Sequence, residues 1–73
     1  MERLTPVSHR ELIRRLRKLG FDGPYPGTKH PFFIRNGRPY HVPNPHGHEL
    51  SVSLLRRVLA QLEITRAEWV SAE

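Results

Sequence analysis

Residues 32–42 read FFIRNGRPYHV, two apolar runs on either side of the dipeptide Asn36-Gly37. Asn-Gly in this setting is the strongest short-range signal for a β-hairpin, closed by a two-residue type I′ turn. Pro39 has no N–H to donate, so it is expected to face a sheet edge or a turn. The turn also sets the strand register, which pairs Arg35 with Arg38, Phe33 with Tyr40 and Phe32 with His41.

This register has a consequence for charge, because Arg35 lies directly opposite Arg38. Like charges in that position cost stability unless an anion lies nearby. We therefore predict that both arginines help to bind an anion, such as a phosphate group of RNA. The aromatic residues Phe32, Phe33 and Tyr40 are expected in the core rather than on a base-stacking surface. An exposed aromatic beside arginines would suit single-stranded RNA, and the sequence leaves open which of the three faces outward.

Helices are predicted on both sides of the hairpin, each beginning at a hydroxyl side chain. The first spans 8–19, with Ser8 and Glu11 in a capping box and Gly20 as its end. The second begins at Ser51, and a short last turn begins at the capping box 65–68. The apolar positions of the second helix recur at helical spacing: Leu55, Val58, Leu59 and Leu62.

The remaining segments read as connections. Residues 21–27 (FDGPYPG) are rich in proline and glycine, which favours a short edge strand or an extended loop. Residues 43–50 (PNPHGHEL) read as a polar loop. The order helix, short strand, hairpin, helix predicts a two-layer α+β domain with an antiparallel sheet. We expect one domain over 1–73 with a core at about 8–70. Double-stranded-RNA-binding modules have the same order, which is an analogy of shape.

Composition narrows the class of partner. Twelve Lys and Arg face seven Asp and Glu, and ten of the twelve cations are arginines. Such a balance favours a polyanion, which is nucleic acid, an acidic protein or, as the weakest candidate, a membrane surface. The 73 residues include no cysteine, no apolar leader and no stretch that could span a bilayer. The expected location is the cytoplasm.

The segment Gly27-Thr28-Lys29-His30 is the strongest candidate site. Histidine titrates near neutral pH, so it suits general acid–base catalysis. Lys29 and Thr28 could hold a phosphate through charge and hydroxyl, and Gly27 would let the backbone approach it closely. The alternative is a histidine at a strand entry that is only solvated or hydrogen-bonded. The sequence leaves both the catalytic and the structural interpretation of His30 open.

The run His46-Gly47-His48-Glu49 has the chemistry of a metal site. Its spacing, however, is not that of a structural zinc site, which shows four well-separated ligands. We expect no metal, and instead a polar loop in which His46 faces RNA or the loop caps the following helix.

Taken together, RELIRRLRKLGF, GTKH, the hairpin, Val42-Pro43 and HEL-S-LLRRVLAQLEITRAEW resemble the HicA (YcfA-like) toxins of prokaryotic toxin–antitoxin pairs. The resemblance covers roughly 8–69. In that family a G-S-x-H segment carries an essential histidine, which corresponds here to His30, with Thr28 in place of the serine. This chain departs from the family at Lys29, often histidine, and at 23–26 (GPYP), where members carry a strand.

The resemblance implies an endoribonuclease that cleaves mRNA without metal or cofactor, and a HicB-type antitoxin that covers its site. His30 would exchange a proton with the ribose 2′-oxygen or the leaving 5′-oxygen, and water, the substrate or His46 would complete the acid–base pair. Two alternatives remain from the residues themselves. One is a non-catalytic RNA-binding module of the same fold, and the other is a domain whose basic face docks an acidic protein.

Overall fold

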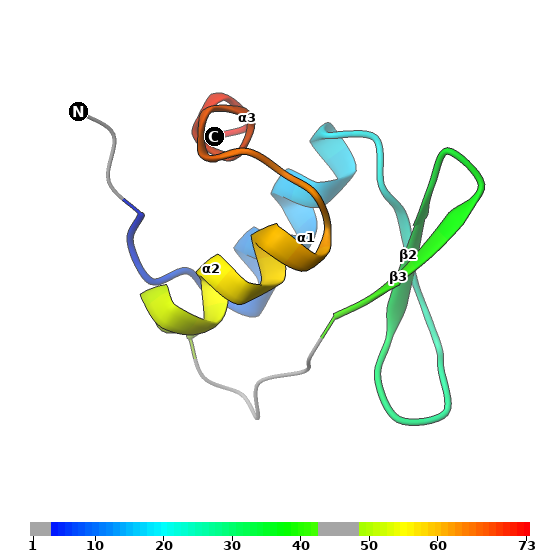
Figure 1. The fold of residues 1–73 in the computed structure, drawn as a ribbon. Coiled ribbons are helices and arrows are strands. Elements are labelled where there is room, and N and C mark those ends of the chain that lie inside the picture. The colour runs from blue at the N-terminus through cyan, green and yellow to red at the C-terminus, as the bar shows by residue number, and fades with distance from the viewer. Residues whose placement is uncertain (1–3, 43–48) are drawn as a thin grey trace.

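A computed structural model describes residues 4–42 and 49–73. Three strands form one antiparallel sheet in the order β1-β2-β3, and the helices pack on one of its faces (Figure 1). The predicted α+β class and antiparallel sheet are therefore confirmed. The elements are α1 (His9–Lys18), β1 (Asp22–Tyr25), β2 (Phe32–Arg35), β3 (Arg38–His41), α2 (Val52–Gln61) and α3 (Arg66–Ser71).

The hairpin of β2 and β3 has the predicted register, in which Arg35 pairs with Arg38 and Phe33 with Tyr40. Asn36 and Gly37 have φ angles of 54° and 75°. Positive φ at both central residues is what a type I′ turn requires, and it matches the right-handed twist of the strands. Pro39 lies on β3, an edge strand of the sheet, as its missing N–H requires.

The segment 21–27 resolves into the short edge strand β1 followed by a loop. β1 pairs with β2 through Asp22 opposite Ile34 and Tyr25 opposite Phe32, with an irregularity between these pairs. A Cβ at Gly23 would lie 3.0 Å from the backbone oxygen of Phe32. The backbones of β1 and β2 approach closely there. Pro24 is tolerated because β1 is an edge strand.

Hydroxyl side chains cap the N-termini of the three described helices, and one predicted contact of a cap is wrong. Ser8 accepts a hydrogen bond from the Glu11 N–H at 3.0 Å, so α1 has the predicted cap. The Glu11 carboxylate, however, accepts from Arg14 and Arg15 instead of reaching back to the N-cap. Two guanidinium groups one turn ahead are charged donors and compete successfully with a backbone N–H. The capping box that begins α3, at Thr65, is present as predicted.

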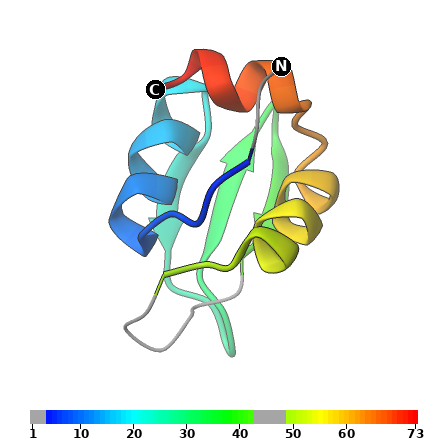
Figure 2. The same cartoon turned by 90° about the vertical axis from the view of Figure 1, so that its left-hand side faces the viewer.

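The core lies between the helices and the inner face of the sheet. In Figure 2 the helices lie in front of the sheet, with α1 toward one edge, α2 toward the other edge and α3 across one end. The segment before α1 runs between them, and Val7 exchanges backbone hydrogen bonds with Leu50. The core thus extends slightly beyond 8–70. Its buried side chains are Val7, Leu12, Leu16, Phe21, Phe33, Val42, Leu50, Leu55, Val58, Leu59, Leu62, Ile64, Trp69 and Ala72.

The three hairpin aromatics do not share one environment. Phe33 is 1% exposed and belongs to the core, and Tyr40 packs against it. Phe32 is half-buried and lies outside this cluster, so the prediction that placed it in the core is wrong. Strand alternation is the reason, because neighbouring residues of β2 point to opposite faces of the sheet.

Candidate functional site

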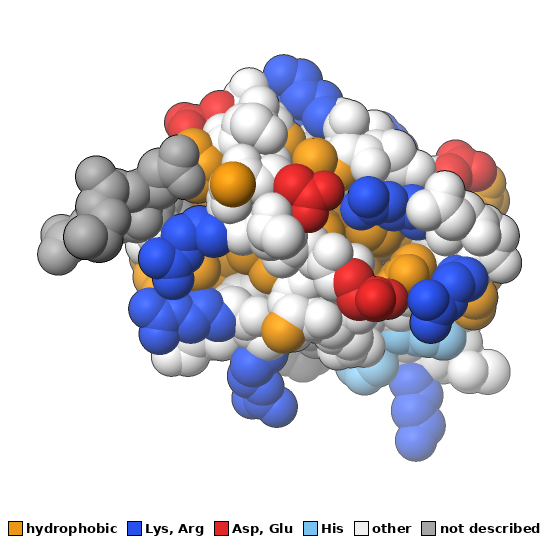
Figure 3. Space-filling model, turned by 45° about the horizontal axis from the view of Figure 1, so that its top comes forward, with side chains coloured by type: hydrophobic (Ala, Val, Ile, Leu, Met, Phe, Trp, Pro, Cys, Tyr) orange, Lys and Arg blue, Asp and Glu red, His pale blue; other side chains and the backbone are white. Residues whose placement is uncertain are grey.

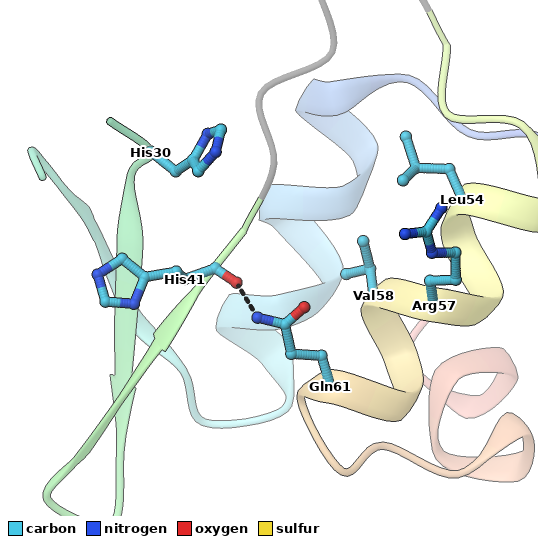
Figure 4. A pocket seen from close by; sticks show the side chains of 6 residues that line it. All are labelled: His30, His41, Leu54, Arg57, Val58 and Gln61. Atoms are coloured by element: carbon cyan, nitrogen blue, oxygen red, sulfur yellow. Dashed lines mark hydrogen bonds between the residues drawn. The ribbon is translucent and has the colours of Figure 1, made fainter. Parts of the chain in front are cut away.

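A hollow of about 260 Å³ lies between the sheet and α2. It is called the β3–α2 hollow below, and Figure 4 shows its lining from close by. One wall comes from the loop before β2 and the end of β3, and the other comes from α2. The described residues that line it are His30, His41, Leu54, Arg57, Val58 and Gln61.

His30 reaches this hollow from the loop that precedes β2, and it is exposed. The hairpin pairing continues beside it, because the Val42 N–H donates to the Pro31 carbonyl at 3.0 Å. Val42 is fully buried. The imidazole is therefore accessible while its backbone is anchored, one residue away, to the core of the protein.

Gly27 shapes the backbone of His30. A Cβ at Gly27 would lie only 2.2 Å from the His30 carbonyl oxygen. A separation below 3.0 Å is one that real side chains essentially never show. Glycine is therefore required here for the close packing of the loop on itself. Thr28 and Lys29 are exposed on the same loop, next to His30 in sequence.

Arg57 forms part of the opposite wall, and the sequence reasoning missed it. Figure 4 shows its guanidinium beside Leu54 on the side of α2 that borders the hollow. Val58 and Gln61 continue that side along the helix. Positions 54, 57 and 61 have helical spacing, so together with the buried Val58 they form the border of the buried stripe that faces the hollow. That spacing was the available signal.

The backbone carbonyl and the imidazole of His41 point in different directions. Its backbone carbonyl accepts a hydrogen bond from the Gln61 side-chain amide at 3.1 Å. Its imidazole is turned away from α2 (Figure 4) and lies 5.7 Å, centroid to centroid, from the Phe32 ring. His41 therefore borders the hollow, but its ring belongs to the outer face of the sheet.

Arg35 and Arg38 lie at the hairpin turn, the other end of β2 from His30. Five residues of extended chain separate Arg35 from His30, which is roughly 16 Å. Both arginines face acidic side chains of the protein: Arg35 lies 3.9 Å from Glu68 and Arg38 lies 3.5 Å from Glu63. The like-charge pair is thus compensated from within the chain, and the fold does not bring it to the hollow.

The His46 prediction and the run 46–48 lie outside the described residues. Within the described part, no three His, Cys, Asp or Glu side chains form a group that could hold a metal ion. In the same ranges, no helix has the length and apolar character needed to cross a membrane.

Charged side chains of both signs mix on the surface seen in Figure 3, where carboxylates lie between Lys and Arg side chains. On α1, one carboxylate accepts hydrogen bonds from two arginines. Hydrogen bonds from Arg14 and then Arg15 lower the pKa of Glu11 from its ordinary 4.5 to about 2. At α3, hydrogen bonds from Thr65 lower the pKa of Glu68. The net positive charge is therefore dispersed on this face rather than gathered in one patch.

Fold and site define a small basic α+β protein with an exposed histidine beside a hollow that also presents an arginine. A family model described as "HicA toxin of bacterial toxin-antitoxin" matches residues 9–64. That range is most of the 73 residues, so the chain belongs to the HicA toxin family of bacterial toxin–antitoxin systems. The family implies an antitoxin partner. No curated protein and no solved structure matches the chain.

Proposed function

We propose that this toxin is an endoribonuclease that cleaves mRNA with His30 as its catalytic residue. The observation that carries the proposal is the exposed imidazole of His30 at a hollow whose far wall presents Arg57. A proton carrier and a permanently charged guanidinium on opposite walls of one hollow are two of the groups that phosphodiester cleavage by transesterification needs.

The proposed reaction begins with attack of the ribose 2′-oxygen on the adjacent phosphorus. The bond from phosphorus to the 5′-oxygen breaks, and the products are a 2′,3′-cyclic phosphate and a 5′-hydroxyl. His30 accepts the 2′-hydroxyl proton or donates one to the leaving oxygen. Arg57 and Lys29 stabilise the negative charge that develops on the phosphate oxygens. No metal or cofactor takes part in these steps.

The second proton carrier of the pair is assigned to water or to the substrate. His41 is the nearest candidate along the hollow, but its imidazole faces the outer side of the sheet. A ring in that position is poorly directed for proton transfer at a phosphate held between His30 and Arg57. His46 remains a further candidate from the sequence.

RNA contacts in this proposal are divided between two regions. Thr28 and Lys29 contact the phosphate nearest His30, while Gly27 keeps the loop closed behind it. Arg35 and Arg38 lie at the far end of the hairpin. They can meet RNA only beyond the cleaved phosphate, and only where it competes with Glu68 and Glu63.

Two finer points belong to the same proposal. The layered arrangement of helices on one face of an antiparallel sheet supports a likeness to double-stranded-RNA-binding domains. The antitoxin partner is proposed to be a HicB-type protein that covers His30, because an exposed nuclease site would damage the cell that makes it.

The test is cleavage of 5′-labelled mRNA by the purified chain, with and without EDTA. We expect cleavage at equal rates in both, and 2′,3′-cyclic phosphate ends on the products. Absence of cleavage with RNA binding intact would favour the alternative, a non-catalytic RNA-binding module. Cleavage abolished by EDTA would contradict the metal-independent mechanism.

A further inference from the structure

Among the described residues, the outer face of the sheet carries a row of three aromatic side chains, one from each strand. Tyr25 of β1 pairs with Phe32 of β2, and Phe32 pairs with His41 of β3. Directly paired residues point to the same face. Phe33 faces the core, so its neighbour Phe32 and both of its partners face away from it. The three residues are called the aromatic row below.

The rings of the aromatic row are evenly spaced. Centroids are 5.6 Å apart from Tyr25 to Phe32 and 5.7 Å apart from Phe32 to His41. The interplanar angles are 31° and 42°, so neighbouring rings are tilted relative to each other and lie side by side on one surface. The Tyr25 hydroxyl donates to the Asp22 carboxylate, which holds the outermost ring in place.

The described helices leave the aromatic row uncovered. All of them pack on the other side of the sheet (Figures 1 and 2). Tyr25 is the most exposed large apolar side chain of the described residues, at 38%. His41 is exposed and Phe32 is half-buried. Three adjacent, partly exposed rings on the face of the sheet opposite the core are suited to contact a partner with flat apolar faces.

The position of the aromatic row relative to the β3–α2 hollow indicates which partner it contacts. The aromatic row lies at the end of the sheet that holds His30, and His41 belongs both to the row and to the β3–α2 hollow. A strand whose phosphate occupies the hollow must continue on one side or the other, and the row is the adjoining surface. The outer face becomes aliphatic, at Ile34 and Pro39, only toward the hairpin turn. The rings are thus confined to the end where RNA is proposed to bind.

We propose that Tyr25, Phe32 and His41 form a stacking platform for unpaired bases of single-stranded RNA next to the phosphate held at His30. The inference rests on the proposed function, since it requires RNA in the hollow. Aromatic rings on a sheet surface are a general means of stacking two or three bases. Stacking tolerates any base, because every base has a π-face. The platform would therefore select unpaired over paired RNA rather than one sequence over another.

The test uses the full chain carrying His30→Ala, which the proposed function expects to slow cleavage by at least about 100-fold. Fluorescence anisotropy measures its affinity for a labelled eight-nucleotide RNA and for the same RNA with abasic riboses at its central positions. Tyr25→Ala is expected to weaken binding of the ordinary RNA roughly 5- to 150-fold, the cost of losing one stacked base. The same variant is expected to bind abasic RNA as the parent does, because no base is then available to stack.

Matched variants separate stacking from other effects. Tyr25→Phe keeps the ring and should bind like the parent, whereas Tyr25→Leu keeps apolar bulk without a π-face and should resemble Tyr25→Ala. His9→Ala on α1 controls for a distant change, and thermal melting checks that each variant folds. Equal affinity of the parent and Tyr25→Ala for ordinary RNA would overturn the proposal and leave the row to a protein partner. Equal loss on both RNAs would overturn it as well.

The outcome is distinguishable from failure of the proposed function. If the unmutated chain does not cleave RNA, the nuclease proposal fails, while base-dependent binding at Tyr25 would still support the platform. If the chain cleaves RNA but Tyr25→Ala binds normally, the platform fails and the nuclease proposal stands.

Discussion

The Gln61 side-chain amide donates a hydrogen bond of 3.1 Å to the backbone carbonyl of His41. This bond joins the last turn of α2 to the end of β3, and both residues line the β3–α2 hollow. The two walls of the hollow are therefore connected directly as well as through the core below them.

Replacing Gln61 with Met keeps the length of the side chain and removes the donor. We expect the free energy of unfolding to fall by about 0.5–1.5 kcal/mol, the net contribution of one hydrogen bond. Urea denaturation measures it. Arg56→Met, at an exposed position of the same helix, is the control and should stay within about 0.5 kcal/mol of the parent. Equal stability of Gln61→Met and the parent would show that the bond contributes nothing.

Gly27→Ala should impair catalysis more than folding. The added Cβ would lie 2.2 Å from the His30 carbonyl oxygen, so the loop must shift and carry His30 with it. A displacement of about 1 Å can cost roughly 100-fold in rate. Single-turnover cleavage of labelled RNA measures this loss. Gly20→Ala is the control, because a Cβ there meets nothing within 4 Å, although its φ of 93° strains alanine. It should lose some stability and retain the parent's cleavage rate. A Gly27→Ala variant as active as the parent would disprove the positioning role.

Acidification should destabilise the fold partly through Glu11. Its pKa is about 2 in the folded chain against an ordinary 4.5, so the folded state favours the ionised carboxylate. The resulting stabilisation is present above pH 4.5 and is lost as the pH falls toward 2. We expect Glu11→Gln to be less stable than the parent at pH 7 and to lose less stability between pH 5 and 2. Glu49→Gln, at an exposed position, controls for the loss of one carboxylate. Parallel pH curves for Glu11→Gln and the parent would contradict this linkage.

Arg57 should contribute more to RNA binding than its neighbour Arg56, although both substitutions remove one charge from α2. Each phosphate neutralised on a single strand contributes about 0.7 to the slope of log affinity against log salt. Arg57→Ala should make that slope shallower by about 0.7, and Arg56→Ala, one residue outside the hollow, should change it less. Identical slopes for the two variants would mean that the hollow does not hold a phosphate.

The sequence predicted those parts of the fold that depend on local chemistry. Asn36-Gly37 determined the turn and the register, and the hydroxyl residues Ser8, Ser51 and Thr65 marked the helix starts. The Glu11 contact was mispredicted because its carboxylate had several donors within one turn. That competition depends on side-chain geometry, which residue spacing does not reveal.

The site was only partly predictable, because its second wall comes from a distant segment. His30 could be selected from its own neighbours in the chain, whereas Arg57 meets the hollow only once α2 packs beside β3. The hairpin pattern did not show which face of β2 the helices cover, so the outward position of Phe32 was missed. The predicted partnership of Arg35 and Arg38 with RNA remains a prediction, with Glu68 and Glu63 as competitors.

The central claim is that His30 transfers a proton in RNA cleavage, and the direct measurement is the single-turnover cleavage rate of His30→Ala. Loss of a general acid–base should lower the rate by about 10²–10⁴. The exposed side chain contributes little packing, so folding and RNA affinity should change little. His9→Ala, on α1, should cleave at the parent's rate. A folded His30→Ala protein that also cleaves RNA at the parent's rate would contradict the account.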